Sequence, residues 1–143
     1  MEYICDAPDG KTWFSIVTEA EVIAESQEMR HAVEKHFRIH RESAAKSFKP
    51  VSTVFFEQAI GLEAHIKREM PLFLTLRDAD GVALATAMLP PTGKLHCAFN
   101  ITIVGPDNSD PYPSQRAAIR ALGDHFGIAL DRSHCSRIAG DCR

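Results

Sequence analysis

The sequence of 143 residues lacks a long apolar run. Its longest stretch of apolar and small residues is Val82 to Leu89, far short of the roughly 20 residues that a membrane-spanning helix needs. The start, Met1 to Asp6, does not place a basic segment before an apolar one, which is the pattern of a secretory signal. We therefore expect a cytoplasmic protein that has no membrane partner.

The chain also lacks an excess of positive charge. The formal net charge is -3 at pH 7, so the chain as a whole lacks the electrostatic surface that attracts nucleic acid, and we do not expect nucleic acid as a partner. Hydrophobic residues make up 45% and charged residues 24%, a balance that is too apolar for intrinsic disorder. The length suits a single domain over residues 1–143, in which the polar residues 131–143 form a frayed tail.

Cysteine is sparse, and no secretory signal accompanies it. The four cysteines are Cys5, Cys97, Cys135 and Cys142. Free thiols are therefore expected rather than a disulfide framework. A pairing of Cys135 with Cys142 stays open.

Glycine and proline are absent between residues 19 and 47. Thr18 and Glu21 form a capping box, which marks a helix start, and Lys49-Pro50 ends the helical stretch. The pattern predicts one long amphipathic helix of about 40 Å, as wide as the domain, so it has to bend, break or project. Residues that recur at three- and four-residue spacing form its apolar stripe: Val22, Ile23, Ser26, Met29, Val33, His36, Phe37, His40 and Ala44.

Two hairpins and two further helices complete the predicted elements. A type I turn at Pro8, with Gly10 in the left-handed conformation, joins strands over residues 3–5 and 11–16. Gly81 plays the same part between strands 72–77 and 82–89, and a third strand covers 97–104, while 128–130 is a possible short strand. Helices are predicted over 57–70, with a stripe of Phe55, Ala59, Leu62 and Ile66, and over 115–126, with Ser114 as the cap and Gly127 as the stop.

This element order predicts an α+β fold. We expect an antiparallel sheet, made of the N-terminal hairpin and a three-stranded meander, with the long central helix and the C-terminal helix packed on it and the helices gathered on one face. The order resembles the profilin-like, roadblock and longin architectures. That resemblance implies a platform for binding or dimerisation, and it rests on topology alone.

His36 and His40 lie four residues apart, the spacing at which one helix supplies two ligands to a zinc ion. A zinc site needs further ligands, and the candidates are His31, Glu34 and the tail residues His134, Cys135 and Cys142. Position 37 is Phe, so the glutamate of a metalloprotease helix is missing. The other interpretation is that both histidines line the edge of the apolar stripe.

Basic residues gather between positions 30 and 50, where six lysines and arginines stand against two glutamates, a local charge of +4. This stretch is either a ligand or partner surface that includes Arg30, Lys35, Arg38 and Arg41, or the basic end of a helix that suits its own dipole. The second interpretation also pairs Glu34 with Arg38 at i,i+4.

The sequence contains no coherent catalytic set. We expect a non-enzymatic interaction or regulatory module that meets a protein partner, or a second copy of itself, through the long helix or the sheet edge. A small metal protein or enzyme that uses His36 and His40 with tail histidine and cysteine residues is the alternative. A small-molecule-binding domain is a third hypothesis.

Overall fold

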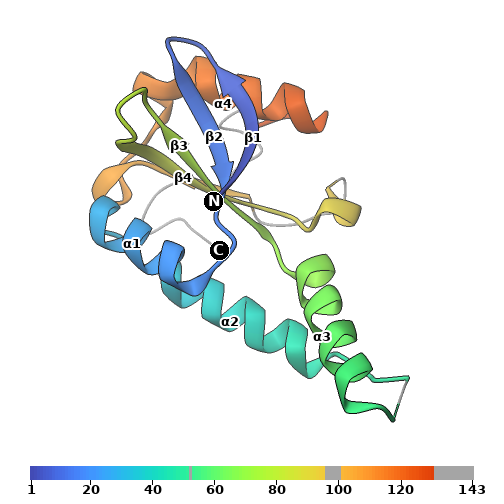
Figure 1. The fold of residues 1–143 in the computed structure, drawn as a ribbon. Helices are drawn as coiled ribbons and strands as arrows, with labels where there is room; N and C mark the ends of the chain where they lie inside the picture. Colours follow the sequence, from blue (N-terminus) through green and yellow to red (C-terminus); the bar gives the residue numbers. More distant parts are fainter. Residues whose placement is uncertain (52, 96–100, 131–143) are drawn as a thin grey trace.

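The computed structural model describes residues 1–51, 53–95 and 101–130. Figure 1 shows a sheet with helices on both sides. Within the described ranges, no helix is long and apolar enough to span a bilayer. The elements are β1 (Glu2–Ala7), β2 (Lys11–Ser15), α1 (Glu19–Met29), α2 (Val33–Lys46), α3 (Phe55–Glu69), β3 (Leu72–Arg77), β4 (Ala83–Leu89), η1 (Thr92–Lys94), β5 (Thr102–Val104), η2 (Pro106–Asn108) and α4 (Tyr112–Phe126).

The predicted α+β class is confirmed. The five strands lie in the order β1-β2-β3-β4-β5, and every neighbouring pair is antiparallel. Pairing of β2 with β3, with Trp13 opposite Leu76, joins the N-terminal hairpin to the meander. The first turn differs from the prediction, because Asp9 as well as Gly10 has a positive φ, which a type I turn does not allow at that position.

Helices cover both faces of the sheet, so the expectation that they gather on one face is wrong. Successive residues of a strand point to opposite faces. Phe73 packs with Phe37 of α2 and Ile66 of α3, whereas its neighbour Leu74 packs with α4. The sheet therefore separates α1, α2 and α3 from α4 (Figure 1).

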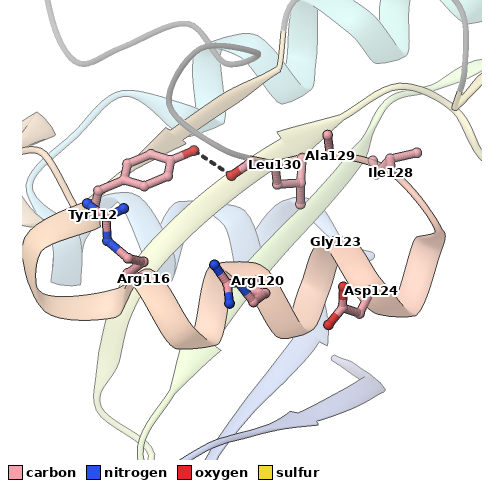
Figure 2. Close-up of a pocket in the computed structure, with 8 residues that line it drawn as sticks. All are labelled: Tyr112, Arg116, Arg120, Gly123, Asp124, Ile128, Ala129 and Leu130. Carbon is pink, nitrogen blue, oxygen red and sulfur yellow. Dashed lines mark hydrogen bonds between the residues drawn. The ribbon is translucent and has the colours of Figure 1, made fainter.

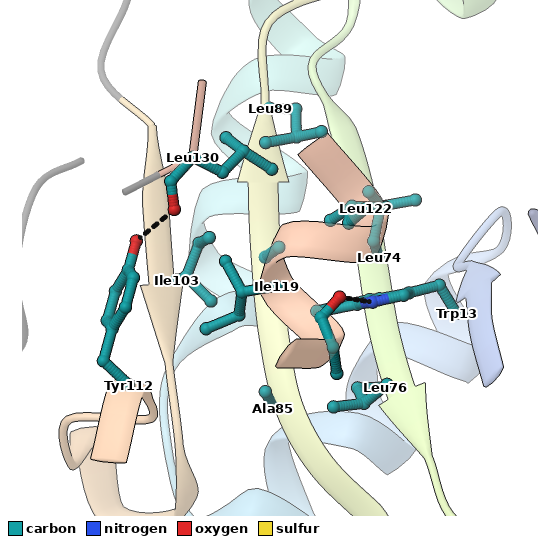
Figure 3. Close-up of a cluster of buried hydrophobic side chains, with 12 residues drawn as sticks. Trp13, Leu74, Leu76, Ala85, Leu89, Ile103, Tyr112, Ile119, Leu122 and Leu130 are labelled. Atoms are coloured by element: carbon teal, nitrogen blue, oxygen red, sulfur yellow. Dashed lines mark hydrogen bonds between the residues drawn. The ribbon is translucent and has the colours of Figure 1, made fainter. Parts of the chain in front are cut away.

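The core on the α4 face is made almost entirely of apolar side chains (Figure 3). Two polar atoms within it are satisfied by backbone carbonyls. The indole Nε1 of Trp13 donates to the Ala118 oxygen at 2.8 Å, and the Tyr112 hydroxyl donates to the Leu130 oxygen at 2.8 Å. These two bonds fix the position of α4 and of the segment that follows it.

The predicted long helix breaks at Arg30. This residue adopts the left-handed conformation, with φ 55° and ψ 52°, and ends α1 by donating its N–H to the Ser26 carbonyl. The capping box of Thr18 and Glu21 at the start of α1 is confirmed. After the break a second helix, α2, starts at Val33. Of the three predicted outcomes for the long helix, which were to bend, to break or to project, the structure shows a break.

Other element boundaries also differ from the prediction. α3 starts at Phe55, and α4 starts at Tyr112 instead of after Ser114, although Gly127 ends it in the left-handed conformation as predicted. Residues 128–130 do not form a strand. The third strand of the meander is described only over β5, and residues 96–100 of the predicted strand, with Cys97, lie outside the described ranges.

Candidate functional site

The predicted histidine pair lies on α2, one turn apart. His36 is exposed, and His40 is half-buried, with its ring centroid 6.4 Å from that of Phe73. Burial lowers the pKa of His40, and the nearby His36 lowers it further. This position agrees with a histidine at the edge of the apolar stripe.

The other candidate ligands do not gather around this pair in the part of the chain that the structure describes. There, no group of three or more histidines, cysteines and acids is placed to hold a metal ion. His31 is hydrogen-bonded to the sheet instead. His134, Cys135 and Cys142 lie outside the described residues. Zinc binding stays a prediction, which elemental analysis of protein purified without a histidine tag tests.

Most of the predicted basic surface is neutralised by the chain's own carboxylates. Lys35 is exposed on α2. The three arginines form ion pairs: Arg30 with Asp107 at 2.6 Å, Arg38 with Glu19 at 3.4 Å, and Arg41 with Glu63 at 3.1 Å. Arg38 also interacts with the charge of Glu34, the i,i+4 partner that the spacing predicted. Each paired guanidinium attracts a phosphate less strongly than a free one does.

A buried polar network lies where α1 meets the sheet. Glu25 of α1 is fully buried, and one carboxylate oxygen accepts a hydrogen bond from Arg77 Nη2 at 2.7 Å. The other oxygen accepts from the Thr86 hydroxyl at 2.5 Å. Glu28, one turn later, accepts from the backbone N–H of Ala83 at 2.7 Å. A buried carboxylate is tolerated only with such partners, and here they attach α1 to β3 and β4.

The network extends to His31 and sets the tautomer of that ring. The single proton of the Thr86 hydroxyl points to Glu25, so Thr86 Oγ1, at 2.9 Å from His31 Nε2, accepts a hydrogen bond from that nitrogen. This geometry places a proton on Nε2 of His31. Its Nδ1 and the Oε2 of Glu34 are buried without a hydrogen-bond partner among the described residues. Burial lowers the pKa of His31, while the charges of Glu25 and Glu34 oppose that shift.

This network positions helices. Although a hydroxyl between a carboxylate and an imidazole resembles part of a hydrolase triad, the Thr86 proton is directed to Glu25, and the Thr86 side chain is almost fully buried. The two hollows described below are lined by other residues, so neither gives a substrate access to Thr86.

The larger hollow is a groove of about 540 Å³ between the sheet and the inner side of α3. Its walls are largely apolar and include Ile4, Ile16 and Phe73. Both signs of charge stand around it, with Arg41 and Glu63 paired to each other. Its volume suits a small ligand, but the charged groups do not favour one class of ligand over another.

The smaller hollow, of about 230 Å³, lies between α4 and residues 128–130 (Figure 2). Gly123 allows the segment to lie this close, because a Cβ there would be 2.8 Å from the Ile128 carbonyl oxygen. Arg116 and Arg120 stand on successive turns of α4, followed by Asp124. The hollow is smaller than the roughly 300 Å³ at which ligand pockets begin.

A group of exposed apolar side chains lies at the start of α3. We call it the apolar tip. It consists of Val51, Val54, Phe55, Phe56 and Ile60. Phe55 is 85% exposed and Phe56 is 71% exposed. Figure 1 shows that the start of α3 lies at the end of the α2–α3 arm that is farthest from the sheet.

The arm holds this tip in place through contacts on the opposite side of α3. The Ser47 hydroxyl donates to the Ala44 carbonyl, so it accepts from His65 Nε2 at 2.7 Å. The Phe48 ring packs against His65, with 5.5 Å between ring centroids, and lies 3.3 Å from the position of a Cβ on Gly61. These contacts orient α3 so that both phenylalanines at its start face outward.

Comparisons with family models, with curated proteins and with solved structures found no match. The resemblance to the profilin-like, roadblock and longin architectures therefore stays one of predicted element order. The chain's own geometry is the basis for a functional proposal.

The sequence contained a signal for the apolar tip. The prediction placed part of it, Phe55, in the buried stripe of α3. The predicted stripe of α3 ran through Phe55 and Ala59, but both are exposed, and burial begins at Leu62 and Ile66. The first turns of α3 are apolar on more than one side, because Phe56 follows Phe55 directly. A helix with more apolar residues than one face of its own domain can cover has a second surface to bury.

Proposed function

We propose that this protein is a non-enzymatic interaction module that docks another protein chain on the apolar tip of its α2–α3 arm. The observation that carries the proposal is the exposure of Phe55 and Phe56 side by side at the start of α3. Aromatic side chains of this kind supply much of the binding energy at protein interfaces. A cytoplasmic location stays a prediction.

The size and position of the apolar tip favour a protein partner. A buried phenylalanine contributes about 150 to 250 Å² and aliphatic residues somewhat less, so these five partly exposed side chains present on the order of 600 Å². Monomeric soluble proteins rarely expose a larger apolar patch than this. The tip stands at the end of a projecting arm, whereas small-molecule sites are concave.

A photo-activated cross-linker at the tip tests this proposal. We expect p-benzoylphenylalanine in place of Phe56 to give a cross-linked protein product in cells that express the chain. The matched control places the same group at Tyr3, which is 59% exposed on β1. The proposal also requires that Phe55→Asp abolishes the product. Equal products from both positions, or none from position 56, would contradict it.

A further inference from the structure

We infer that the partner on the apolar tip is a second copy of this chain, which pairs its tip with the first about a twofold axis. This inference rests on the proposed function, since it names the occupant of the same surface. The area of the tip, its charge and the architecture of the arm support a second copy as the occupant.

The area of the tip agrees with what a small homodimer buries. Two tips that cover each other completely remove about 1,200 Å² from water, which is the lower limit for a specific, stable interface. A twofold contact uses the same patch on both copies, so one apolar surface is enough and no complementary groove is required.

Charge does not oppose the approach of an identical copy. Residues 47–60 contain one basic residue, Lys49, and one acidic residue, Glu57, so the net charge of the segment is +1 − 1 = 0. A partner selected by electrostatics would require an excess of one sign, and two identical charged patches would repel each other. A neutral apolar patch is compatible with its own copy.

The arm also has the architecture of half a helix bundle. α2 and α3 contact each other through pairs such as Arg41–Glu63 and Ser47–His65, but this two-helix arm leaves the outer side of the α3 start uncovered. A second copy of the arm presents the same apolar side chains to it, and the two arms together form a four-helix arrangement. Because the tip is at the far end of the arm, the two sheets remain apart (Figure 1).

Sedimentation equilibrium of the purified full chain, from about 1 to 500 µM, is the test. We expect the mass to rise from 15.8 kDa toward twice that value, with a midpoint in the micromolar range that suits an interface of this size. The Phe55→Asp/Phe56→Asp variant is expected to stay monomeric throughout. The matched control, Val17→Asp/Val82→Asp, changes two exposed valines outside the tip and is expected to associate like the wild type.

Far-UV circular dichroism establishes that each variant is folded. The cross-linker at position 56 of the purified protein is an independent test of the dimer, because it does not place a charge in the tip. A covalent dimer from position 56, and none from position 3, supports the twofold contact. A wild-type protein that stays monomeric at 500 µM and gives no covalent dimer would overturn it. If position 56 then cross-links to a different protein in cells, the proposed function stands and the second copy is excluded. If it cross-links to nothing, both fail.

Discussion

The two faces of the sheet are built from different chemistry. On the α4 face the strands contribute Leu74, Leu76 and Ala85, and the polar atoms among them belong to one indole and one phenol. On the other face, Thr75 and Thr86 lie opposite each other and a fully buried glutamate approaches them from α1. The apolar face depends on packing for its stability, whereas the other, which we call the polar face, combines an apolar cluster around Phe37 and Phe73 with the hydrogen bonds of Glu25.

The two faces also differ in how completely the helices cover them. α4 lies along an apolar face and buries its own apolar stripe there. On the other face the network holds α1, and the arm that follows extends beyond the sheet, so the start of α3 remains exposed. The proposed docking surface therefore belongs to the face that is less completely covered.

The largest expected effect comes from Trp13→Ala on the α4 face. Removing a large, fully buried aromatic side chain leaves a cavity and costs about 3 to 5 kcal/mol of unfolding free energy. It also leaves the Ala118 carbonyl without its donor. Urea denaturation measures the loss, with Tyr3→Ala on exposed β1 as the control. A loss below about 1 kcal/mol would show that packing does not dominate this face.

Glu25→Ala tests the polar face, where the expected loss is about 3 kcal/mol because Arg77 is left mostly buried without its main partner. The matched double variant Glu25→Met/Arg77→Met removes both charges and is expected to recover much of that loss. Denaturant midpoints for the two variants measure the difference. If the double variant is as unstable as Glu25→Ala, the hydrogen bonds themselves, rather than the unpaired charge, stabilise this face.

Acidification is expected to weaken the polar face through His31. Burial holds the pKa of this ring below its ordinary value of 6.5, so between that value and the lower folded-state pKa the unfolded chain binds more protons than the native one. The contribution of His31 to the unfolding free energy is fully present above pH 6.5 and is lost as the pH falls through this window. Three other charged groups act on the His31 ring. Glu25 and Glu34 favour its protonated form, and His36 disfavours that form.

The control for this prediction is His31→Gln, which keeps a side-chain donor for Thr86 and does not titrate. His40, whose pKa is also lowered, is present in both proteins and cancels in the comparison. We expect the unfolding free energy of the wild type to fall more steeply than that of the variant from pH 7 to 5. Parallel curves would mean that His31 has the same pKa in both states.

Local signals in the sequence predicted most of the elements. Thr18 and Glu21 marked the start of α1, and Gly81 and Gly127, both at positive φ, marked a turn and a helix end. These features act over a few residues, so one stretch of sequence is sufficient to recognise them. The two-sided arrangement of helices depends on which face of β3 each one meets, and local patterns do not contain that information.

The parts that the sequence missed depend on distant contacts. Arg30 is 77 positions from Asp107, with which it forms two hydrogen bonds, and His31 is 55 positions from Thr86. Neither glycine nor proline marks the break between α1 and α2 in the sequence. The signal that was present is the polar pair Thr75 and Thr86 inside otherwise apolar strands, which indicates that something polar packs on that face.

The smallest expected effect concerns the break at Arg30 itself. A left-handed conformation costs a residue with a Cβ about 1 kcal/mol that glycine does not lose, while the exposed, solvent-screened ion pair with Asp107 opposes that cost. Arg30→Gly removes both terms and is expected to stay within about 0.5 kcal/mol of the wild type. Arg30→Ala removes only the ion pair, so it is expected to be about 1 kcal/mol less stable than Arg30→Gly in urea denaturation.

If Arg30→Ala is as stable as Arg30→Gly, the left-handed conformation does not set the stability of this position. Alanine is the strongest helix former, so such a result would indicate that α1 and α2 had merged into the single helix that the sequence pattern predicts. Helical content from far-UV circular dichroism would then rise in the alanine variant. A merged helix would also pull His31 away from Thr86 and remove the acid-sensitive step. The pH profile of Arg30→Ala therefore decides whether the break and the polar network depend on each other.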